Sequence, residues 1–350
     1  MESEFKQEDQ VELKRSTKKR VLSIDIPQFA TDLLEKLKEK YIFDFIVPDP
    51  HSREETIKKI HKAAERNTYD ACFWVFKNAP ISPFTKEMLG PLMPSCRLFI
   101  TGAAGYDDLD IEWMAANGAY AANAQNAPTE GTAIMNLLLF LSVLRGSREA
   151  EQTMRSGKWH GNLPLMEDPR GKIVGIIGMG AIGKSFAQKI ISLGGRVIYN
   201  NRTRLSKEEE ESLDVQYVNF DELLTTSDVI SVNCPLTLST KNLLSKNEFQ
   251  KMKDGVYILN TARGNIIDEE AFIEAIQSGK VSRAGLDVFV NEPSPNPFWL
   301  TCDKVTVQPH WGGFTTSTAV KVEEAILENI DTFFKTGRPL NPVNTPAIQL

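Results

Sequence analysis

The chain has 350 residues, which is long for a single hydrophobic core and favours two domains. Hydrophobic residues make up 41% and charged residues 25% of it, with a formal net charge of −6. These values are typical of a globular protein and argue against nucleic acid as a partner. No apolar run approaches the roughly 20 residues of a membrane span, which excludes a membrane protein of the helical kind.

The first segment and the cysteines point to the cytoplasm. Residues 1–20 are highly charged and lack the apolar core of a secretory signal, so we expect a solvated arm. The four cysteines, Cys72, Cys96, Cys234 and Cys302, show no metal-binding spacing. We therefore expect reduced thiols, no metal ion and a cytoplasmic protein.

The first third of the chain alternates strand patterns with helical patterns. Strands are expected at 21–26, 43–47, 71–76 and 97–101, and helices at 30–40 and 53–66. This alternation is typical of βαβ units, which build a parallel sheet.

A long helix is expected over residues 129–144. It is apolar nearly all round, with Leu137 to Leu141 in one run, so it should be buried between domains or at a subunit interface.

The strand pattern begins again at Ile173 and leads into a glycine motif. An apolar run, Ile173 to Ile177, continues into Gly178-x-Gly180-x-x-Gly183, and a helical segment follows over 184–193. In this context Gly178 allows the turn, Gly180 lets the backbone approach a pyrophosphate, and Gly183 lets helix and strand pack closely. The helix N-terminus then offers N–H groups to an anion. The motif predicts a dinucleotide site, although an ordinary βα turn with spare glycines is the alternative.

Further strands are expected at 196–200, 215–218, 229–232, 256–260, 284–288 and 305–307. A last helix is expected over 316–336, where Gly337-Arg-Pro339 ends it. Two connecting helices suggest that the C-terminal end returns to the first domain.

Three of the later strands are followed by residues that suit acid–base chemistry. Arg263, Glu292 and His310 each follow a different strand, and ligands of open α/β sheets bind beyond the carboxyl ends of strands. Taken singly, they also fit a surface ion pair, a solvated loop and a packed ring. Together they suit hydride transfer to a 2-oxo acid, with the guanidinium binding carboxylate and carbonyl and the imidazole as proton donor. Glu292 would raise the pKa of that imidazole and fix its tautomer.

Four ordered motifs resemble those of the D-isomer-specific 2-hydroxyacid dehydrogenase family. They are Gly178-x-Gly180-x-x-Gly183, Asn260-Thr-Ala-Arg-Gly264, Gly285-Leu-Asp-Val-Phe289 with Glu292-Pro293, and Pro309-His310-x-Gly312-Gly313. The resemblance covers residues 21–340 and is strongest to fungal glyoxylate and hydroxypyruvate reductases and D-mandelate dehydrogenases. It implies an α/β fold of two doubly wound domains, a Rossmann cofactor domain inserted into a flavodoxin-like substrate domain. The expected boundaries are 1–20 for the arm, 21–125 plus 316–350 for the substrate domain, and 126–315 for the NAD(P)-binding domain.

The resemblance also implies roles for single residues. Arg263, Glu292 and His310 would carry catalysis, and the backbone N–H groups of Ala104 and Gly105 would hold the substrate carboxylate. Asp287 would bond the nicotinamide carboxamide. The other cofactor-binding residues expected are Thr132, Gly178, Gly180, Ala181, Ile182, Gly183, Asn200, Arg202, Thr203, Cys234, Pro235, Thr240, Thr261, Ala262 and Gly312.

One departure from the family pattern concerns the cofactor. Asn200 stands where NAD-dependent relatives carry an acid for the ribose 2′-OH. With no carboxylate to repel a 2′-phosphate, and with Arg202 and Arg204 able to clamp one, NADP(H) is the expected cofactor. NAD(H) is the alternative, if these arginines face solvent.

The sequence leaves alternatives open for the substrate and for the function. Lys77, after the strand at 71–76, would approach the substrate, although a solvent-facing lysine is the alternative. Glyoxylate or hydroxypyruvate is the first expected 2-oxo acid and an aryl 2-oxo acid the second. The resemblance implies a homodimer. A dinucleotide-sensing transcriptional corepressor of the same family is the competing function, since that branch also keeps the Arg, Glu and His.

Overall fold

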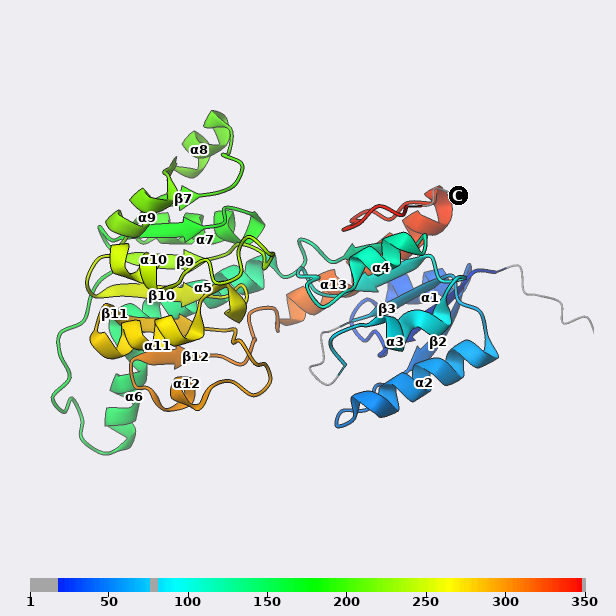
Figure 1. The fold of residues 1–350 in the computed structure, drawn as a ribbon, viewed down its shortest axis with the longest axis horizontal. Helices are drawn as coiled ribbons and strands as arrows, with labels where there is room; N and C mark the ends of the chain where they lie inside the picture. The colour runs from blue at the N-terminus through cyan, green and yellow to red at the C-terminus, as the bar shows by residue number, and fades with distance from the viewer. Residues whose placement is uncertain (1–17, 76–80, 348–350) are drawn as a thin grey trace, which may run out of the picture.

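The computed structural model describes residues 18–75 and 81–347 of the chain. Within these ranges the strands form two sheets, one in each of two lobes that lie side by side (Figure 1). Neighbouring strands run parallel in both sheets. Of the described part of the chain, no helix is both long enough and apolar enough to cross a membrane.

The first sheet has the strand order β2-β1-β3-β4-β5, which is that of flavodoxin-like folds. Its strands are β1 (Arg20–Ile24), β2 (Ile42–Ile46), β3 (Ala71–Trp74), β4 (Leu98–Thr101) and β5 (Tyr120–Asn123). The helices of this lobe are α1 (Thr31–Lys38), α2 (Arg53–Arg66), α3 (Lys86–Leu89), α4 (Ile111–Ala116) and α13 (Thr316–Thr336).

The second sheet has the order β12-β11-β10-β9-β6-β7-β8, so the strand order reverses between β6 and β9, as in Rossmann folds. Its strands are β6 (Ile173–Ile177), β7 (Arg196–Asn200), β8 (Val215–Tyr217), β9 (Val229–Val232), β10 (Val256–Asn260), β11 (Val281–Leu286) and β12 (Val305–Val307). The helices of this lobe are α5 (Thr129–Arg145), α6 (Ser147–Arg155), α7 (Ala181–Ser192), α8 (Lys207–Leu213), α9 (Phe220–Thr226), α10 (Lys246–Lys251), α11 (Glu269–Ser278) and α12 (Pro297–Thr301).

The α/β fold class expected from the sequence is confirmed, and each predicted strand has a counterpart within a few residues. The strand expected at 71–76 ends at Trp74, and residue 76 lies outside the described ranges. The sequence pattern missed β5, whose segment Tyr-Ala-Ala-Asn contains no β-branched residue.

The last helix, α13, lies with the first lobe, as two connecting helices suggested (Figure 1). Its apolar side chains Val322, Ile326 and Ile330 share one buried cluster with side chains of the first sheet. The carboxylate of Glu323, 2% exposed, accepts hydrogen bonds from the backbone N–H groups of Gln28, Phe29 and Ala30, at 2.7–2.9 Å. Helix α13 is thus bonded to the entry of α1, almost 300 residues earlier in the chain.

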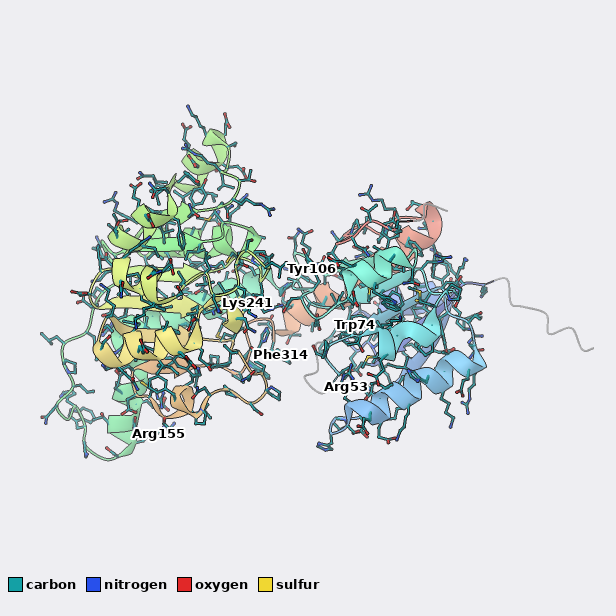
Figure 2. All side chains as sticks on the ribbon, in the orientation of Figure 1. Arg53, Trp74, Tyr106, Arg155, Lys241 and Phe314 are labelled. Atoms are coloured by element: carbon teal, nitrogen blue, oxygen red, sulfur yellow. The ribbon has the colours of Figure 1, made fainter. Side chains whose placement is uncertain are left out.

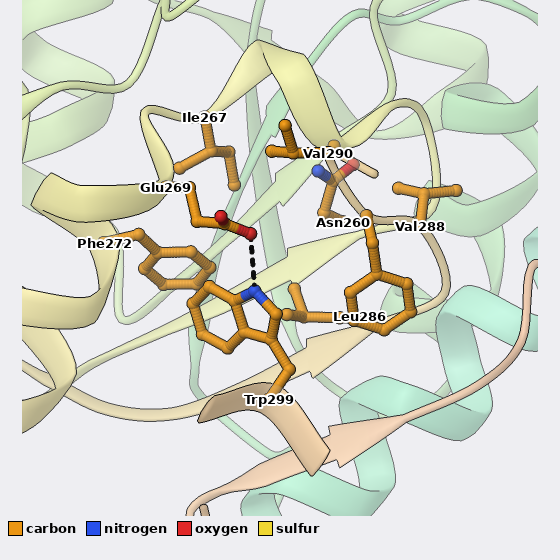
Figure 3. Close-up of a pocket in the computed structure, with 10 residues that line it drawn as sticks. Asn260, Ile267, Glu269, Phe272, Leu286, Val288, Val290 and Trp299 are labelled. Atoms are coloured by element: carbon orange, nitrogen blue, oxygen red, sulfur yellow. Dashed lines mark hydrogen bonds between the residues drawn. The ribbon is translucent and has the colours of Figure 1, made fainter. Parts of the chain in front are cut away.

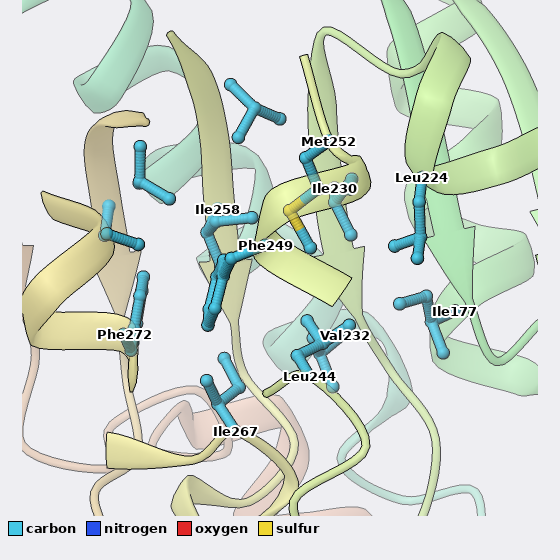
Figure 4. Close-up of a cluster of buried hydrophobic side chains, with 14 of the residues drawn as sticks. Ile177, Leu224, Ile230, Val232, Leu244, Phe249, Met252, Ile258, Ile267 and Phe272 are labelled. Carbon is cyan, nitrogen blue, oxygen red and sulfur yellow. The ribbon is translucent and has the colours of Figure 1, made fainter. Parts of the chain in front are cut away.

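The second sheet has a buried apolar cluster on each face, as expected of a parallel sheet covered by helices. Figure 4 shows one of them, where Ile230, Val232 and Ile258 of central strands meet Phe249 and Phe272 of α10 and α11. Such packing holds the strand ends at fixed positions, which the site beyond them requires.

In the single chain, helix α5 is buried on one side and exposed on the other. Leu139, Phe140 and Val143 are buried against the second sheet and α7. Ile134 and Leu138, one turn apart, remain 52% and 48% exposed in the single chain.

Candidate active site

Adjacent strands bring the predicted catalytic residues to one edge of the second sheet. Strands β10, β11 and β12 are neighbours and run parallel, so their carboxyl ends lie side by side. Arg263 follows β10, Glu292 follows β11, and His310 follows β12. The loops that begin there therefore meet.

His310 and Glu292 form a hydrogen-bonded pair. The Nδ1 atom of His310 lies 2.7 Å from Oε2 of Glu292, and Oε1 of Glu292 accepts from the Phe289 N–H at 2.9 Å. Although burial alone would raise it, the pKa of Glu292 is lowered overall by the bond to His310 and by nearby positive charge. An ionised Glu292 requires the proton on Nδ1, which leaves Nε2 to face a substrate. The backbone of His310 has φ of 56°, uncommon for a residue with a side chain and frequent at functional sites.

A close backbone contact joins the loops of Arg263 and Glu292. A Cβ atom at Gly264 would lie 2.1 Å from the carbonyl carbon of Phe289, so only glycine permits this approach. The amide of Asn260 supports the same turn, donating to the Arg263 carbonyl at 2.9 Å and accepting from the Ala262 N–H at 3.0 Å.

Asp287 anchors the loop that carries His310. Its two carboxylate oxygens accept from the N–H groups of Trp311 and Gly312, at 2.6 and 2.9 Å. Burial raises its pKa, and these two bonds only partly oppose that effect. A Cβ at Gly312 would lie 3.4 Å from Thr132, so Thr132 adjoins this loop as well. The predicted bond from Asp287 to the nicotinamide stays a prediction.

The glycine motif lies at the reversal point of the second sheet. Gly178 has φ of 101°, and a Cβ there would lie 2.5 Å from the backbone nitrogen of Cys234. A Cβ at Gly183 would lie 2.4 Å from the Gly178 carbonyl oxygen, whereas one at Gly180 would meet no atom within 4 Å. Ala181 and Ile182 form the first turn of α7, where N–H groups have no partner within the helix. This geometry fits a pyrophosphate above Gly180.

The loop after β9, which borders Gly178, also suits a dinucleotide. Cys234 is half-buried, and burial raises the pKa of its thiol to about 11, so it is not a reactive thiolate near neutral pH. Pro235 follows it, and the Thr240 hydroxyl bonds the Pro235 carbonyl at 2.7 Å, closing that loop. The hydroxyl oxygen of Thr261 is buried and bonds to none of the described residues, as expected of a group that meets a ligand.

The end of β7 departs from one expectation. Asn200 donates its amide to the Val218 carbonyl at 2.9 Å, and Arg202 and Thr203 are exposed. The expected clamp by Arg204 is not what the structure shows. Its guanidinium makes two bonds to Glu210, at 2.7 and 2.8 Å, because α8 brings that carboxylate beneath it. The predicted contact of Arg202 with a 2′-phosphate stays a prediction.

The first lobe contributes the loop after β4. Ala104 and Gly105 are half-buried there, and Asp107, two residues further on, accepts from Nε of Arg263 at 2.8 Å. The sequence reasoning missed Asp107, because no local pattern links it to an arginine 156 residues away. Lys77 lies outside the described residues, so its predicted contact with substrate stays a prediction.

A small apolar pocket lies behind the catalytic loops (Figure 3). Asn260, Leu286 and Val288 line it, together with the Trp299 indole, which donates to Glu269 at 2.8 Å. Its lining includes none of Arg263, Glu292 and His310, so we assign it to the support of the loops rather than to chemistry. The described ranges contain no group of three side chains placed to hold a metal ion.

Comparisons with protein families and with known protein sequences both point to 2-hydroxyacid dehydrogenases. The model for the NAD-binding domain of D-isomer specific 2-hydroxyacid dehydrogenases matches residues 137–312. A Schizosaccharomyces pombe protein that is named as a 2-hydroxyacid dehydrogenase is 64% identical over 334 residues, which cover 95% of this chain and 98% of that protein.

Two solved structures are similar along nearly the whole chain. A glyoxylate reductase from Paecilomyes thermophila superposes with a TM-score of 0.86 at 33% identity, covering 94% of this chain and 99% of the other. The holo form of Rhodotorula graminis D-mandelate dehydrogenase superposes with a TM-score of 0.86 at 28% identity, covering 95% and 99%.

Two of the three motif glycines, Gly180 and Gly183, should respond differently to an added methyl group. We expect Gly183→Ala to lower the free energy of unfolding by about 1–3 kcal/mol, because its Cβ meets backbone. Gly180→Ala should leave stability within about 0.5 kcal/mol but weaken dinucleotide binding at least about tenfold, because its methyl stands where the pyrophosphate approaches. Urea unfolding and NADPH fluorescence titration measure the two effects. Normal NADPH affinity in Gly180→Ala would contradict the assigned site.

Proposed function

The chain belongs to the D-isomer specific 2-hydroxyacid dehydrogenase family and is an NAD(P)-dependent oxidoreductase, and we propose that it reduces a 2-oxo acid to the D-2-hydroxy acid. The observation that supports this most is that Arg263 and the hydrogen-bonded pair of His310 and Glu292 follow three adjacent parallel strands at one edge of the sheet. In this proposal the second lobe binds the dinucleotide, the first lobe binds the substrate, and the protein acts in the cytoplasm.

The side chains divide the work between binding and proton transfer. A bound nicotinamide dinucleotide would supply the hydride. Arg263 would attract the substrate carboxylate and polarise its carbonyl, with the N–H groups of Ala104 and Gly105 holding the carboxylate from the other lobe. His310 would give the proton from Nε2 to the new alkoxide, while Glu292 holds the ring and balances its charge.

Small 2-oxo acids are the first substrates to test. The similarity to a glyoxylate reductase supports glyoxylate or hydroxypyruvate, and the similarity to a D-mandelate dehydrogenase supports an aryl 2-oxo acid as the second candidate.

Steady-state assays with purified protein test the reaction and the roles together. We expect Arg263→Ala and His310→Ala to reduce kcat/KM for glyoxylate, hydroxypyruvate, pyruvate or phenylglyoxylate by about 10²- to 10⁴-fold with stability unchanged. His61→Ala, on α2 and remote from the site, is the control and should keep full activity. Wild-type protein that oxidises neither NADPH nor NADH with any of these acids would sink the proposal and favour dinucleotide sensing.

We further propose that NADPH is the preferred cofactor. The last residue of β7, Asn200, carries a neutral amide, and the exposed Arg202 lies two residues further on. A 2′-phosphate would meet a cation and no carboxylate there.

Two substitutions should separate the two cofactors. Asn200→Asp should raise KM for NADPH about tenfold or more and lower that for NADH, because a carboxylate repels the phosphate and accepts from the ribose hydroxyl. Arg202→Ala should raise only the KM for NADPH. Arg196→Ala, at the other end of β7, is the matched control. The measurement is kcat/KM for both cofactors, and equal values in the wild type would contradict the preference.

We propose that two copies associate through α5 and the segment after it. The exposed pair Ile134 and Leu138 is followed by Met154, Trp159 and Leu165, which are 56%, 66% and 102% exposed. Several strongly exposed apolar side chains in one stretch of chain favour a surface that another molecule covers.

Charge placed on this surface should therefore break the dimer. Sedimentation velocity is expected to give a dimer for the wild type and a monomer for the double variant Ile134→Glu, Leu138→Glu, because two buried carboxylates would lack partners. Val47→Glu, at an equally exposed apolar residue of the first lobe, should leave the dimer intact. A monomeric wild type would rule the interface out.

A further inference from the structure

One ion pair joins the two lobes at the proposed substrate site. The side chain of Arg263, from the loop after β10, reaches Asp107, at the end of the loop after β4, with 2.8 Å between Nε and Oδ1. Tyr106, the neighbour of Asp107, lies where the first lobe faces the second (Figure 2). The two side chains are 19% and 26% exposed, so water screens this pair less than an ordinary surface ion pair.

The protein already engages two of the three guanidinium nitrogens of Arg263. Nε donates to Asp107 and Nη1 donates to the carbonyl oxygen of Ala262 at 2.7 Å. Nη2 lies against Gly105, since a Cβ atom there would come within 1.7 Å of it. Nη2 is thus the nitrogen that faces the loop of Ala104 and Gly105.

We infer that Asp107 is a positioning residue, which holds Arg263 across the lobes so that Nη2 meets a carboxylate bound at Ala104 and Gly105. This inference rests on the proposed function, and it changes one part of it. The substrate does not take the whole planar fork of the guanidinium, because Nε and Nη1 stay with protein acceptors. A 2-oxo acid carboxylate would lie between Nη2 and the N–H groups of the loop.

The energetic reason lies in the freedom of an arginine side chain. An unrestrained arginine loses much rotamer entropy when it binds a ligand, and a side chain already fixed by two bonds loses little. Asp107 would therefore improve binding of the substrate carboxylate without touching it. Because the same carboxylate contact exists before and during the reaction, its loss should raise KM more than it lowers kcat.

Substitution of Asp107 tests this inference through the affinity for a substrate analogue, which the loss of a purely structural contact would not change. With Asp107→Ala, we expect the Kd of oxamate, an unreactive 2-oxo acid analogue, to rise about tenfold in calorimetry with NADP⁺ present. KM for the 2-oxo acid should rise by a similar factor, while kcat and the Kd of NADPH change less than about threefold. Asp107→Asn, whose amide oxygen still accepts from Nε, should stay within about threefold of the wild type for oxamate.

The matched control is Glu149→Ala. It removes a pair of the same kind, Arg283 Nε to Glu149 Oε1 at 2.8 Å, with both side chains similarly buried but within the second lobe. This variant should lose stability without any change in oxamate affinity.

The possible failures are distinguishable. If the wild type binds oxamate but turns over no 2-oxo acid, the proposed reaction is refuted. The Kd of oxamate for Asp107→Ala, compared with that for the wild type, still tests the role of Asp107. An Asp107→Ala variant that matches the wild type in oxamate affinity, while Arg263→Ala loses it, overturns the inference and leaves the proposed reaction standing. No oxamate binding by the wild type overturns both the inference and the anion-binding role of Arg263.

Discussion

The whole site depends on the parallel direction of neighbouring strands. Because β10, β11 and β12 end at one edge of the sheet, residues far apart in the chain arrive within hydrogen-bonding distance of one another. Short-range contacts then fix the loops relative to one another. Gly264 lets the first loop touch the second, and Asp287 ties the third loop down through two N–H groups. The direction of the strands therefore brings the site residues together, and the loop contacts adjust their final positions.

The pKa values of two carboxylates at this edge, Asp287 and Glu292, shift in opposite directions although the residues lie five positions apart in the chain. Asp287 is buried, and burial dominates its balance, so its pKa is raised even with two N–H partners. Glu292 is also desolvated, yet the hydrogen bond to His310 and the nearby cation lower its pKa overall. The hydrogen bond to His310 and the nearby positive charge thus favour the ionised form of Glu292, and an ionised Glu292 can balance a charge that appears on the imidazole during a reaction.

The sequence predicted most of the fold because strand periodicity and the glycine motif are local signals. It missed β5, whose small residues resemble a loop, and it placed Arg204 on the cofactor, because the partner Glu210 comes from a helix that no spacing rule sets beneath it. Asp107 escaped notice for a related reason. Its bond to Arg263 joins the two lobes, and motif spacing within one lobe does not report a contact with the other. What followed from strand direction was predictable, and what followed from the contact of two lobes was not.

The place of α13 in the chain also bears on how the protein is made. The first lobe needs Val322, Ile326 and Ile330 to complete its core, and it needs the Glu323 carboxylate to satisfy the N–H groups before α1. All of these emerge from the ribosome after the complete second sheet, which ends at Val307. The first lobe therefore completes its core only after the second lobe has been synthesised, unlike an N-terminal domain whose residues are all contiguous in the chain. Until residues 322–330 have been translated, the apolar face of the first sheet that they cover lacks part of its packing.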